Sequence, residues 1–155
     1  MKVKVKVPAT SANLGPGFDV AGLALTLYNT FTFELNEGGL NITGCPTQFC
    51  NEENLTYQAF SQAAQSCGLD FKGVNIHCES QVPYTRGLGS SSTCIVAGIV
   101  GAFAFKDKTD DRQEILELAT KIEGHPDNVA PAIFGGLTVS VMSDGVTTLN
   151  IPVKH

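Results

Sequence analysis

Residues 83–94, PYTRGLGSSSTC, decide how the rest of the chain is organised. Gly87 and Gly89 allow backbone turns that a Cβ would forbid. The apolar run that follows, Cys94–Phe105, is typical of a buried helix, and serine is a favoured residue at a helix start. We therefore expect a glycine loop that leads into a helix capped among Ser90–Ser92. Free backbone N–H groups and the helix dipole make such a place attractive to phosphate.

This loop differs from two common phosphate-binding sequences. No lysine follows the second glycine, as a Walker A motif requires, and Ser92 stands where a dinucleotide fingerprint has its third glycine. An ordinary Gly/Ser loop before a capped helix is an equally good interpretation of these residues alone. A dinucleotide-binding oxidoreductase has support only from the two glycines and Asp110, and no repeated βαβ pattern accompanies them.

Two other loop-like stretches carry polar residues among glycines and prolines. Residues 8–19 read PATSANLGPGFD, and residues 123–136 read EGHPDNVAPAIFGG. Together with residues 83–94 they resemble the GHMP kinases, a superfamily that includes galactokinase, homoserine kinase, mevalonate kinase and phosphomevalonate kinase. The first and third stretches resemble the homoserine kinases in particular. The superfamily's late glycine-rich motif has no counterpart, so we expect residues 1–155 to be the N-terminal, ATP-binding domain, with the C-terminal domain absent.

Composition and charge exclude several other classes of protein. The chain has 155 residues, 43% of them hydrophobic, which suits one domain with one core. A net charge of −5 gives no electrostatic footprint for nucleic-acid binding. The N-terminus has no signal-peptide core and no apolar stretch is long enough to span a membrane, so we expect a cytoplasmic protein without a membrane partner. Five cysteines without zinc spacing indicate buried or incidental thiols.

Hydrophobic periodicity predicts strands first and then helices mixed with strands, which is an α+β fold. The resemblance implies the architecture of the second domain of ribosomal protein S5. The expected strands cover residues 2–7, 23–35, 40–43, 74–79, 137–142 and 146–151, with a shaped loop over 8–19. The expected helices start at Asn54, among Ser90–Ser92, near Thr109 and at Val129.

The resemblance implies an ATP site and a magnesium site. The residues implied in nucleotide binding are Asn54, Pro83, Arg86, Gly87, Leu88, Gly89, Ser90, Ser91 and Ser92. Asn54 is equally well explained as a helix cap. The implied Mg²⁺ ligands are Ser90 and Glu117, an assignment that depends on Glu117 lying eight residues before His125. Glu114 and Glu123 compete with Glu117 for this role.

The resemblance also implies an acceptor site for L-homoserine, whose hydroxyl would be phosphorylated to O-phospho-L-homoserine in threonine biosynthesis. Asn13, Asp19, His125 and Asp127 match the substrate-binding positions. Asn13 is the expected catalytic residue, because it could orient the hydroxyl. Loop capping by these side chains is the structural alternative. Another small-molecule GHMP kinase and a non-catalytic nucleotide-binding fragment remain open, as does a homodimer. We expect this chain to be inactive by itself.

Overall fold

The computed structural model describes residues 1–153, without the side chains of Gly17 and Phe18. Its frame is a long antiparallel pair, β1 (Lys2–Leu14) and β2 (Gly17–Asn36). Alternation in β1 buries Val5 and Val7 and leaves the lysines between them exposed, as period-two patterning requires. The expected strand at residues 2–7 is therefore confirmed.

The shaped loop expected over residues 8–19 is wrong for most of that stretch. β1 continues to Leu14 and remains paired with β2, with irregular register between Pro8 and Thr10 and between Ala12 and Leu14. A proline is tolerated where the ladder is irregular, so Pro8 bends the strand without ending it. Asn13 and Asp19, near the turn, both have positive φ angles of 58° and 57°.

The other edge of β2 is shared by two strands. Its C-terminal half pairs with β4 (Gly73–Ser80), and its N-terminal half pairs with β5 (Leu137–Ser143) at Ala21–Leu23. β3 (Leu40–Thr43) adds a parallel strand to β4, and β6 (Gly145–Ile151) pairs with β5. Apart from β1, which pairs with β2, the sheet order is β3-β4-β2-β5-β6. Only the first three residues of β5 reach β2, so the rest of the β5–β6 hairpin projects from the sheet.

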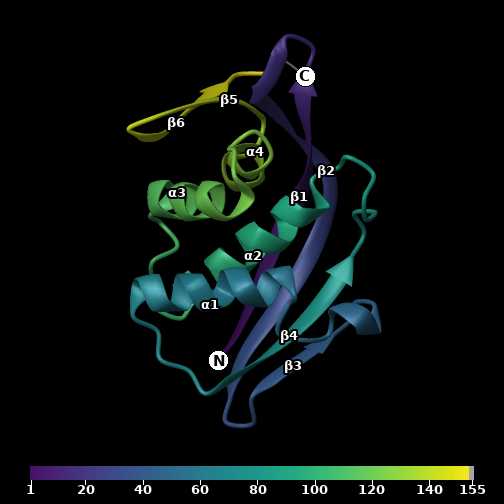
Figure 1. Cartoon of the computed structure of the whole chain (residues 1–155), viewed down its shortest axis with the longest axis vertical. Helices are drawn as coiled ribbons and strands as arrows, with labels where there is room; N and C mark the ends of the chain where they lie inside the picture. The colour runs from purple at the N-terminus through teal and green to yellow at the C-terminus, as the bar shows by residue number, and fades with distance from the viewer. Residues whose placement is uncertain (154–155) are drawn as a thin grey trace.

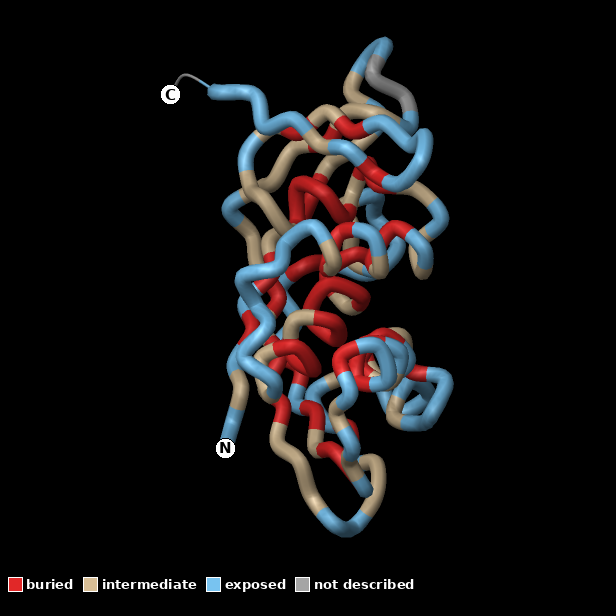
Figure 2. The backbone as a smooth tube through the Cα atoms, turned by 90° about the vertical axis from the view of Figure 1, so that its left-hand side faces the viewer, coloured by how far each residue is buried: buried red, intermediate tan, exposed pale blue. Residues whose placement is uncertain are grey.

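Four α-helices gather on one side of this sheet (Figure 1). They are α1 (Leu55–Cys67), α2 (Ser90–Ala104), α3 (Arg112–Glu123) and α4 (Val129–Phe134), and a short 3-10 helix, η1, covers Thr47–Phe49. Buried segments run through the middle of the fold, with α2 among them (Figure 2). The Phe33 ring of β2 stacks on the Phe60 ring of α1 at 5.4 Å between centroids. Strands and helices mixed in this way confirm the α+β class.

All four helix starts agree with the sequence patterns, and only the cap of α2 differs from the expectation. Asn54 caps α1, since its Oδ1 accepts from the Thr56 and Tyr57 amides, and Asp111 caps α3 through the Glu114 amide. α2 begins at Ser90, but its cap is Gly89, and no side chain caps its first N–H groups. The expected serine cap is wrong because Ser91 and Ser92 bond to another helix instead. No helix within residues 1–153 is long and apolar enough to cross a membrane.

Candidate functional site

The glycine loop is anchored to the sheet at both of its ends. Before the loop, Asn29 of β2 is buried and its Oδ1 accepts from the Gln81 and Val82 amides at 2.9 and 2.8 Å. At the far end, the Thr10 amide of β1 donates to the Leu88 carbonyl at 3.1 Å. These hydrogen bonds fix the loop to β1 and β2.

Gly87 and Gly89 both take left-handed φ angles, 69° and 66°. A Cβ on Gly89 would overlap the Thr10 hydroxyl, whereas a Cβ on Gly87 would meet open space. Gly89 is thus required for close packing and Gly87 for backbone conformation. Because no side chain caps α2, the N–H groups of its first turn remain directed at the space above the loop.

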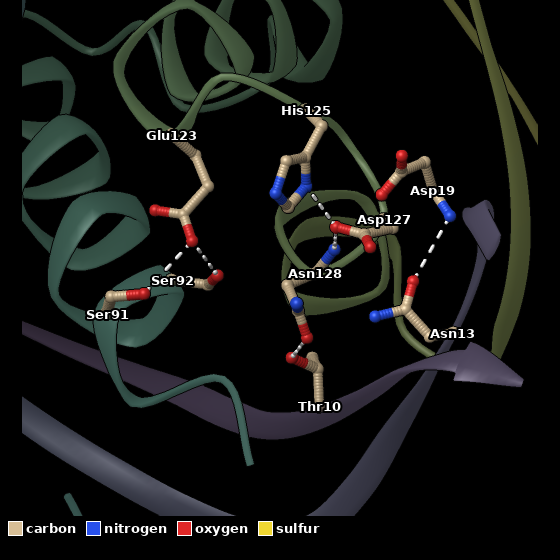
Figure 3. A network of polar contacts seen from close by, with 9 residues as sticks. All are labelled: Thr10, Asn13, Asp19, Ser91, Ser92, Glu123, His125, Asp127 and Asn128. Carbon is tan, nitrogen blue, oxygen red and sulfur yellow. Dashed lines mark hydrogen bonds and ion pairs between the residues drawn. The ribbon is translucent and has the colours of Figure 1, made fainter. Parts of the chain in front are cut away.

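Glu123, the last residue of α3, faces the start of α2. One of its carboxylate oxygens, Oε1, accepts from the Ser91 hydroxyl at 3.0 Å and from the Ser92 hydroxyl at 3.3 Å (Figure 3). The carboxylate is half-buried and lies beside the first turn of α2. Carboxylate and hydroxyl oxygens together are a ligand set that Mg²⁺ accepts.

Glu117, the expected magnesium ligand, lies elsewhere on α3. Its side chain is exposed and accepts from Gln113 at 2.9 Å, beside Gly145 at the turn of the β5–β6 hairpin. None of the hydrogen bonds described for residues 1–153 joins Glu117 to Ser90 or to the glycine loop. Glu117 and Glu123 are six positions apart, which places them on different faces of the helix. The pairing of Glu117 with Ser90 at a magnesium site therefore stays a prediction, and its competitor Glu123 is the acid that contacts the start of α2.

His125 and Asp127 form a bonded pair after α3. The His125 Nδ1 bonds to the Asp127 Oδ1, which also accepts from the Asn128 amide at 2.8 Å. The Asp127 side chain is 1% exposed, and its second oxygen, Oδ2, has no hydrogen-bond partner in the described structure. A buried carboxylate oxygen without a partner is costly, so this oxygen is a candidate acceptor for a donor group.

Asn13 and Asp19 meet this pair from the β1–β2 turn (Figure 3). The Asn13 Oδ1 accepts from the Asp19 amide at 3.1 Å. Ligand atoms of Asp19, His125 and Asp127 all lie within 4.8 Å of one another. The structure therefore brings the four expected substrate residues to one place, and two carboxylates with one imidazole can bind a cation such as an ammonium group or a metal ion.

Thr10 joins the glycine loop to the His125–Asn128 loop, and the sequence motifs did not assign it a role. Its hydroxyl donates to the Asn128 Oδ1 at 2.8 Å, while its amide bonds to Leu88, and the residue is fully buried. Gly22 of β2 has a related function, because a Cβ there would overlap the Asp127 carbonyl oxygen. Both contacts need three-dimensional packing that no local motif reveals.

A cavity of about 580 Å³ extends from Asn13 across the glycine loop to η1 and α1. Its volume falls within the range typical of small-molecule sites. The expected nucleotide residues that line it are Asn54, Arg86, Gly87, Gly89, Ser90 and Ser91. Pro83, Leu88 and Ser92 belong to the same loop and helix but do not line the cavity. Its lining also includes the thiols of Cys45, Cys78 and Cys94, here called the thiol wall, and the rings of Phe49 and Tyr84.

The thiol wall is uncharged at neutral pH. Burial raises the pKa of the Cys45 thiol to about 11 and that of the Cys78 thiol to about 12, and it also raises the pKa of Cys94. These thiols therefore stay protonated and behave as small apolar groups. Uncharged thiols and aromatic rings, together with the free N–H groups of α2, suit a molecule with a flat ring and a phosphate chain.

Asn54 is committed to structural bonds inside this cavity. Its Oδ1 accepts from two amides of α1, and its Nδ2 donates to the Phe49 carbonyl at 2.8 Å. The side chain is therefore a cap first, and a nucleoside contact would have to share these atoms.

Substitution of Asn54 should separate these two roles. Asn54→Asp keeps the cap oxygen, so its free energy of unfolding should lie within about 1 kcal/mol of that of the parent. Asn54→Ala removes the cap and should lower the free energy of unfolding by about 1–2 kcal/mol. Urea unfolding measures both. If Asn54→Asp were as destabilised as Asn54→Ala, the bond from Nδ2 to Phe49 would outweigh the cap.

Residues 54–136 match the family model described as GHMP kinases N terminal domain. This chain belongs to that family. The GHMP kinase match spans α1, the glycine loop and the His125–Asn128 loop, so the α-helices that line the cavity lie within it. The expected GHMP kinase N-terminal fold is confirmed.

Individual GHMP kinases extend the comparison to the whole chain. A homoserine kinase of Clostridium beijerinckii is 51% identical over 155 residues, covering 99% of this chain and 52% of that protein. One from Clostridium botulinum is 50% identical over 149 residues, covering 96% and 50%. The solved structure of the Cytophaga hutchinsonii homoserine kinase superposes with a TM-score of 0.83 at 28% identity, covering 99% and 52%. The chain spans about half the length of the curated relatives it matches.

Proposed function

We propose that this chain carries the ATP site and the acceptor site of a homoserine kinase, which phosphorylates the hydroxyl of L-homoserine. The observation that carries the proposal is the unpartnered, buried Oδ2 of Asp127, held near an uncapped helix start by the link through Thr10. The surroundings of Asp127 suit a cation and the start of α2 suits phosphate, as phosphoryl transfer from ATP to an amino acid requires. The clostridial relatives support the choice of L-homoserine.

In this proposal the nucleotide occupies the 580 Å³ cavity. The base and ribose lie toward Phe49, Tyr84 and the thiol wall, and the triphosphate lies over Gly87–Ser91. Backbone N–H groups at the start of α2 hold the phosphate oxygens, and Arg86 at the rim adds a positive charge. Loose phosphoryl transfer depends mainly on such positioning and charge stabilisation.

Glu123 with Ser90 fits Mg²⁺ better than Glu117 with Ser90. The half-buried carboxylate of Glu123 already lies on hydroxyls at the start of α2, and hard oxygen donors are what Mg²⁺ prefers. A bound Mg²⁺ would neutralise charge on the phosphate oxygens. The chain's part is to hold the carboxylate against the helix start through Ser91 and Ser92.

Glu123→Gln should raise the Mg²⁺ concentration needed for ATP binding by roughly 10–100-fold, since it removes a charged ligand of similar shape. Glu117→Gln is the matched control, because it removes the same charge from the same helix away from the loop. Calorimetric ATP titrations at stepped Mg²⁺ concentrations measure both. A Mg²⁺ dependence altered by Glu117→Gln and unaltered by Glu123→Gln would assign the magnesium ligand to Glu117 instead.

At the acceptor site, the ammonium group of homoserine would donate to Asp127 Oδ2 and to Asp19. His125, fixed by its bond to Asp127, and Asn13 would contact the substrate hydroxyl and orient it toward the phosphate, with Asn13 in the catalytic position. Orientation of this kind is a large part of the rate in such reactions. We also place the reaction in cytoplasmic threonine biosynthesis. A homodimer remains an untested prediction.

The function is tested by titrating the chain with MgATP and with L-homoserine, using mevalonate and galactose as competing acceptors. Binding of MgATP and selective binding of L-homoserine supports the proposal. Preference for mevalonate or galactose would assign another GHMP kinase, and MgATP binding without any acceptor would indicate a nucleotide-binding module.

Phosphorylation by residues 1–155 alone should be at least about a hundredfold slower than by the same residues joined to the second half of the Clostridium beijerinckii relative. Arg86 and Arg112 are the only arginines, and each missing donor for transition-state charge costs roughly 10²–10³ in rate. ADP release with and without homoserine measures this. Turnover within tenfold of the joined chain would mean that these residues contain the full catalytic set.

A further inference from the structure

Two of the five cysteines, Cys45 and Cys50, lie close together beside the proposed nucleotide cavity, and Cys45 lines it. The Sγ atoms of Cys45 and Cys50 are 3.5 Å apart, on either side of η1. Cys50 Sγ also contacts the Cys45 and Pro46 carbonyls at 3.7 Å. Both residues are half-buried, so a small reagent can reach the pair. Spacing in the sequence indicated incidental thiols, but the fold makes these two neighbours.

The backbone around the pair is already closed into a tight loop. The Phe49 amide bonds to the Pro46 carbonyl at 2.9 Å, and the Cys50 amide bonds to the Thr47 carbonyl at 3.1 Å. A disulfide needs sulfur atoms about 2.0 Å apart, so the two Sγ atoms must approach by about 1.5 Å. Rotation of the two side chains can supply much of that movement without opening the loop.

The loop that the pair would close is part of the cavity. Cys45 and Phe49 line the space, and the Phe49 ring lies against the Tyr84 ring with centroids 6.2 Å apart. The Phe49 carbonyl accepts from Asn54, the cap of α1. A nucleoside in the cavity would therefore cover Cys45 and hold the loop that carries both thiols.

We propose that Cys45 and Cys50 form an oxidisable dithiol, which low-molecular-weight disulfides convert to an intramolecular disulfide and which bound nucleotide protects. The Cys50 thiolate attacks one sulfur of the reagent, forming a mixed disulfide and releasing one thiolate. The Cys45 thiolate then attacks the Cys50 sulfur, and the second thiolate leaves. Two electrons pass from the cysteines to the reagent disulfide, and the two cysteine protons end on the two released thiols.

The second step should depend on pH. Burial, together with the neighbouring thiols of Cys50 and of Cys94 on α2, raises the pKa of Cys45 to about 11, although a hydrogen bond with Cys78 on β4 acts in the opposite direction. At pH values below this pKa, the thiolate fraction of Cys45 therefore increases roughly tenfold for each unit by which the pH is raised. Formation of the disulfide should accordingly accelerate from pH 7 to pH 9. The pair should therefore close to a disulfide more slowly at pH 7 than at pH 9.

The test uses the whole chain with glutathione disulfide, followed by acid quenching and peptide mass mapping. We expect the loss of two hydrogen atoms and one cross-linked peptide that joins Cys45 to Cys50, reversed by dithiothreitol. Cys50→Ser should give no cross-link, and Cys67→Ser, at a buried thiol outside the cavity, should leave it unchanged. Mixed disulfides alone, or a bond between any other pair, would overturn the proposal.

Protection of the two thiols by bound nucleotide rests on the proposed nucleotide site. At MgATP about ten times its Kd, cross-linking should slow roughly tenfold, because only the free fraction reacts. Calorimetry on the same sample separates the possible failures. Undiminished cross-linking in a chain saturated with MgATP contradicts protection, whereas absence of MgATP binding contradicts the proposed function and leaves the disulfide to be judged by its mass spectrum.

Discussion

Gly89→Ala should reduce MgATP affinity by at least about a hundredfold, while Gly87→Ala should reduce it far less. Both glycines have left-handed φ angles near 70°, so both substitutions carry a similar conformational cost of about 1–2 kcal/mol. Only at Gly89 does the new methyl group overlap another atom, the Thr10 hydroxyl. Relief of that overlap must displace either the loop or Thr10, and Thr10 also holds the Asn128 loop.

The pair of variants isolates packing from backbone conformation. Calorimetry gives the MgATP affinity of each, and urea unfolding shows whether the Gly89 variant remains folded. If it does not fold, Thr10→Ser and Thr10→Val replace it, because serine keeps the hydroxyl bond to Asn128 and valine removes it. Equal affinities in a folded Gly89→Ala and a folded Gly87→Ala would contradict the assignment of the loop as a phosphate site.

Asp127→Asn should weaken L-homoserine binding by roughly 10–150-fold and leave MgATP binding nearly unchanged. A hydrogen bond to a charged group contributes about 1.5–3 kcal/mol, and the side chain is buried, so water does not screen it. Asp19→Asn is the matched control. Asp19 is exposed, and loss of its charge should cost only a few-fold in affinity, as for other solvent-exposed pairs.

Titration of both variants with L-homoserine and with MgATP measures these effects. An equal loss for the two ligands in Asp127→Asn would mean that the residue supports the whole site through its bonds to His125 and Asn128. A larger loss in Asp19→Asn than in Asp127→Asn would place the ammonium group outside the buried pocket.

Much of the fold follows from local patterns in the sequence. Alternation of Lys and Val predicted the first strand, and Asn54 and Gly68 predicted both ends of α1. The stretch after Pro8 was harder, because proline signals a loop unless the partner strand is known. The cap of α2 was also misassigned, since Ser91 and Ser92 bond to α3, which lies about thirty residues further along the chain.

The site shows the same division between local and distant information. Motifs identified Asn13, Asp19, His125 and Asp127, which the fold brings together. Spacing from His125 chose Glu117, but the choice between two acids of one helix depends on how α3 packs against α2. Thr10 and Gly22 act through contacts with residues more than a hundred positions away, which a single sequence does not indicate.

The projecting β5–β6 hairpin should make the stability of the domain uneven. β5 meets β2 only at Leu137–Val139, and within residues 1–153 the remaining rungs of the hairpin have no third strand beside them. Beyond β2, the hairpin contacts α3, whose Gln113 donates to the Val146 carbonyl. An isolated two-stranded ribbon is marginally stable in water. Amide hydrogens of Thr147–Leu149 should therefore exchange with deuterium through local opening, while those of α2 exchange only on global unfolding. The ligand sites would then remain intact during excursions in which the sheet's outer edge frays.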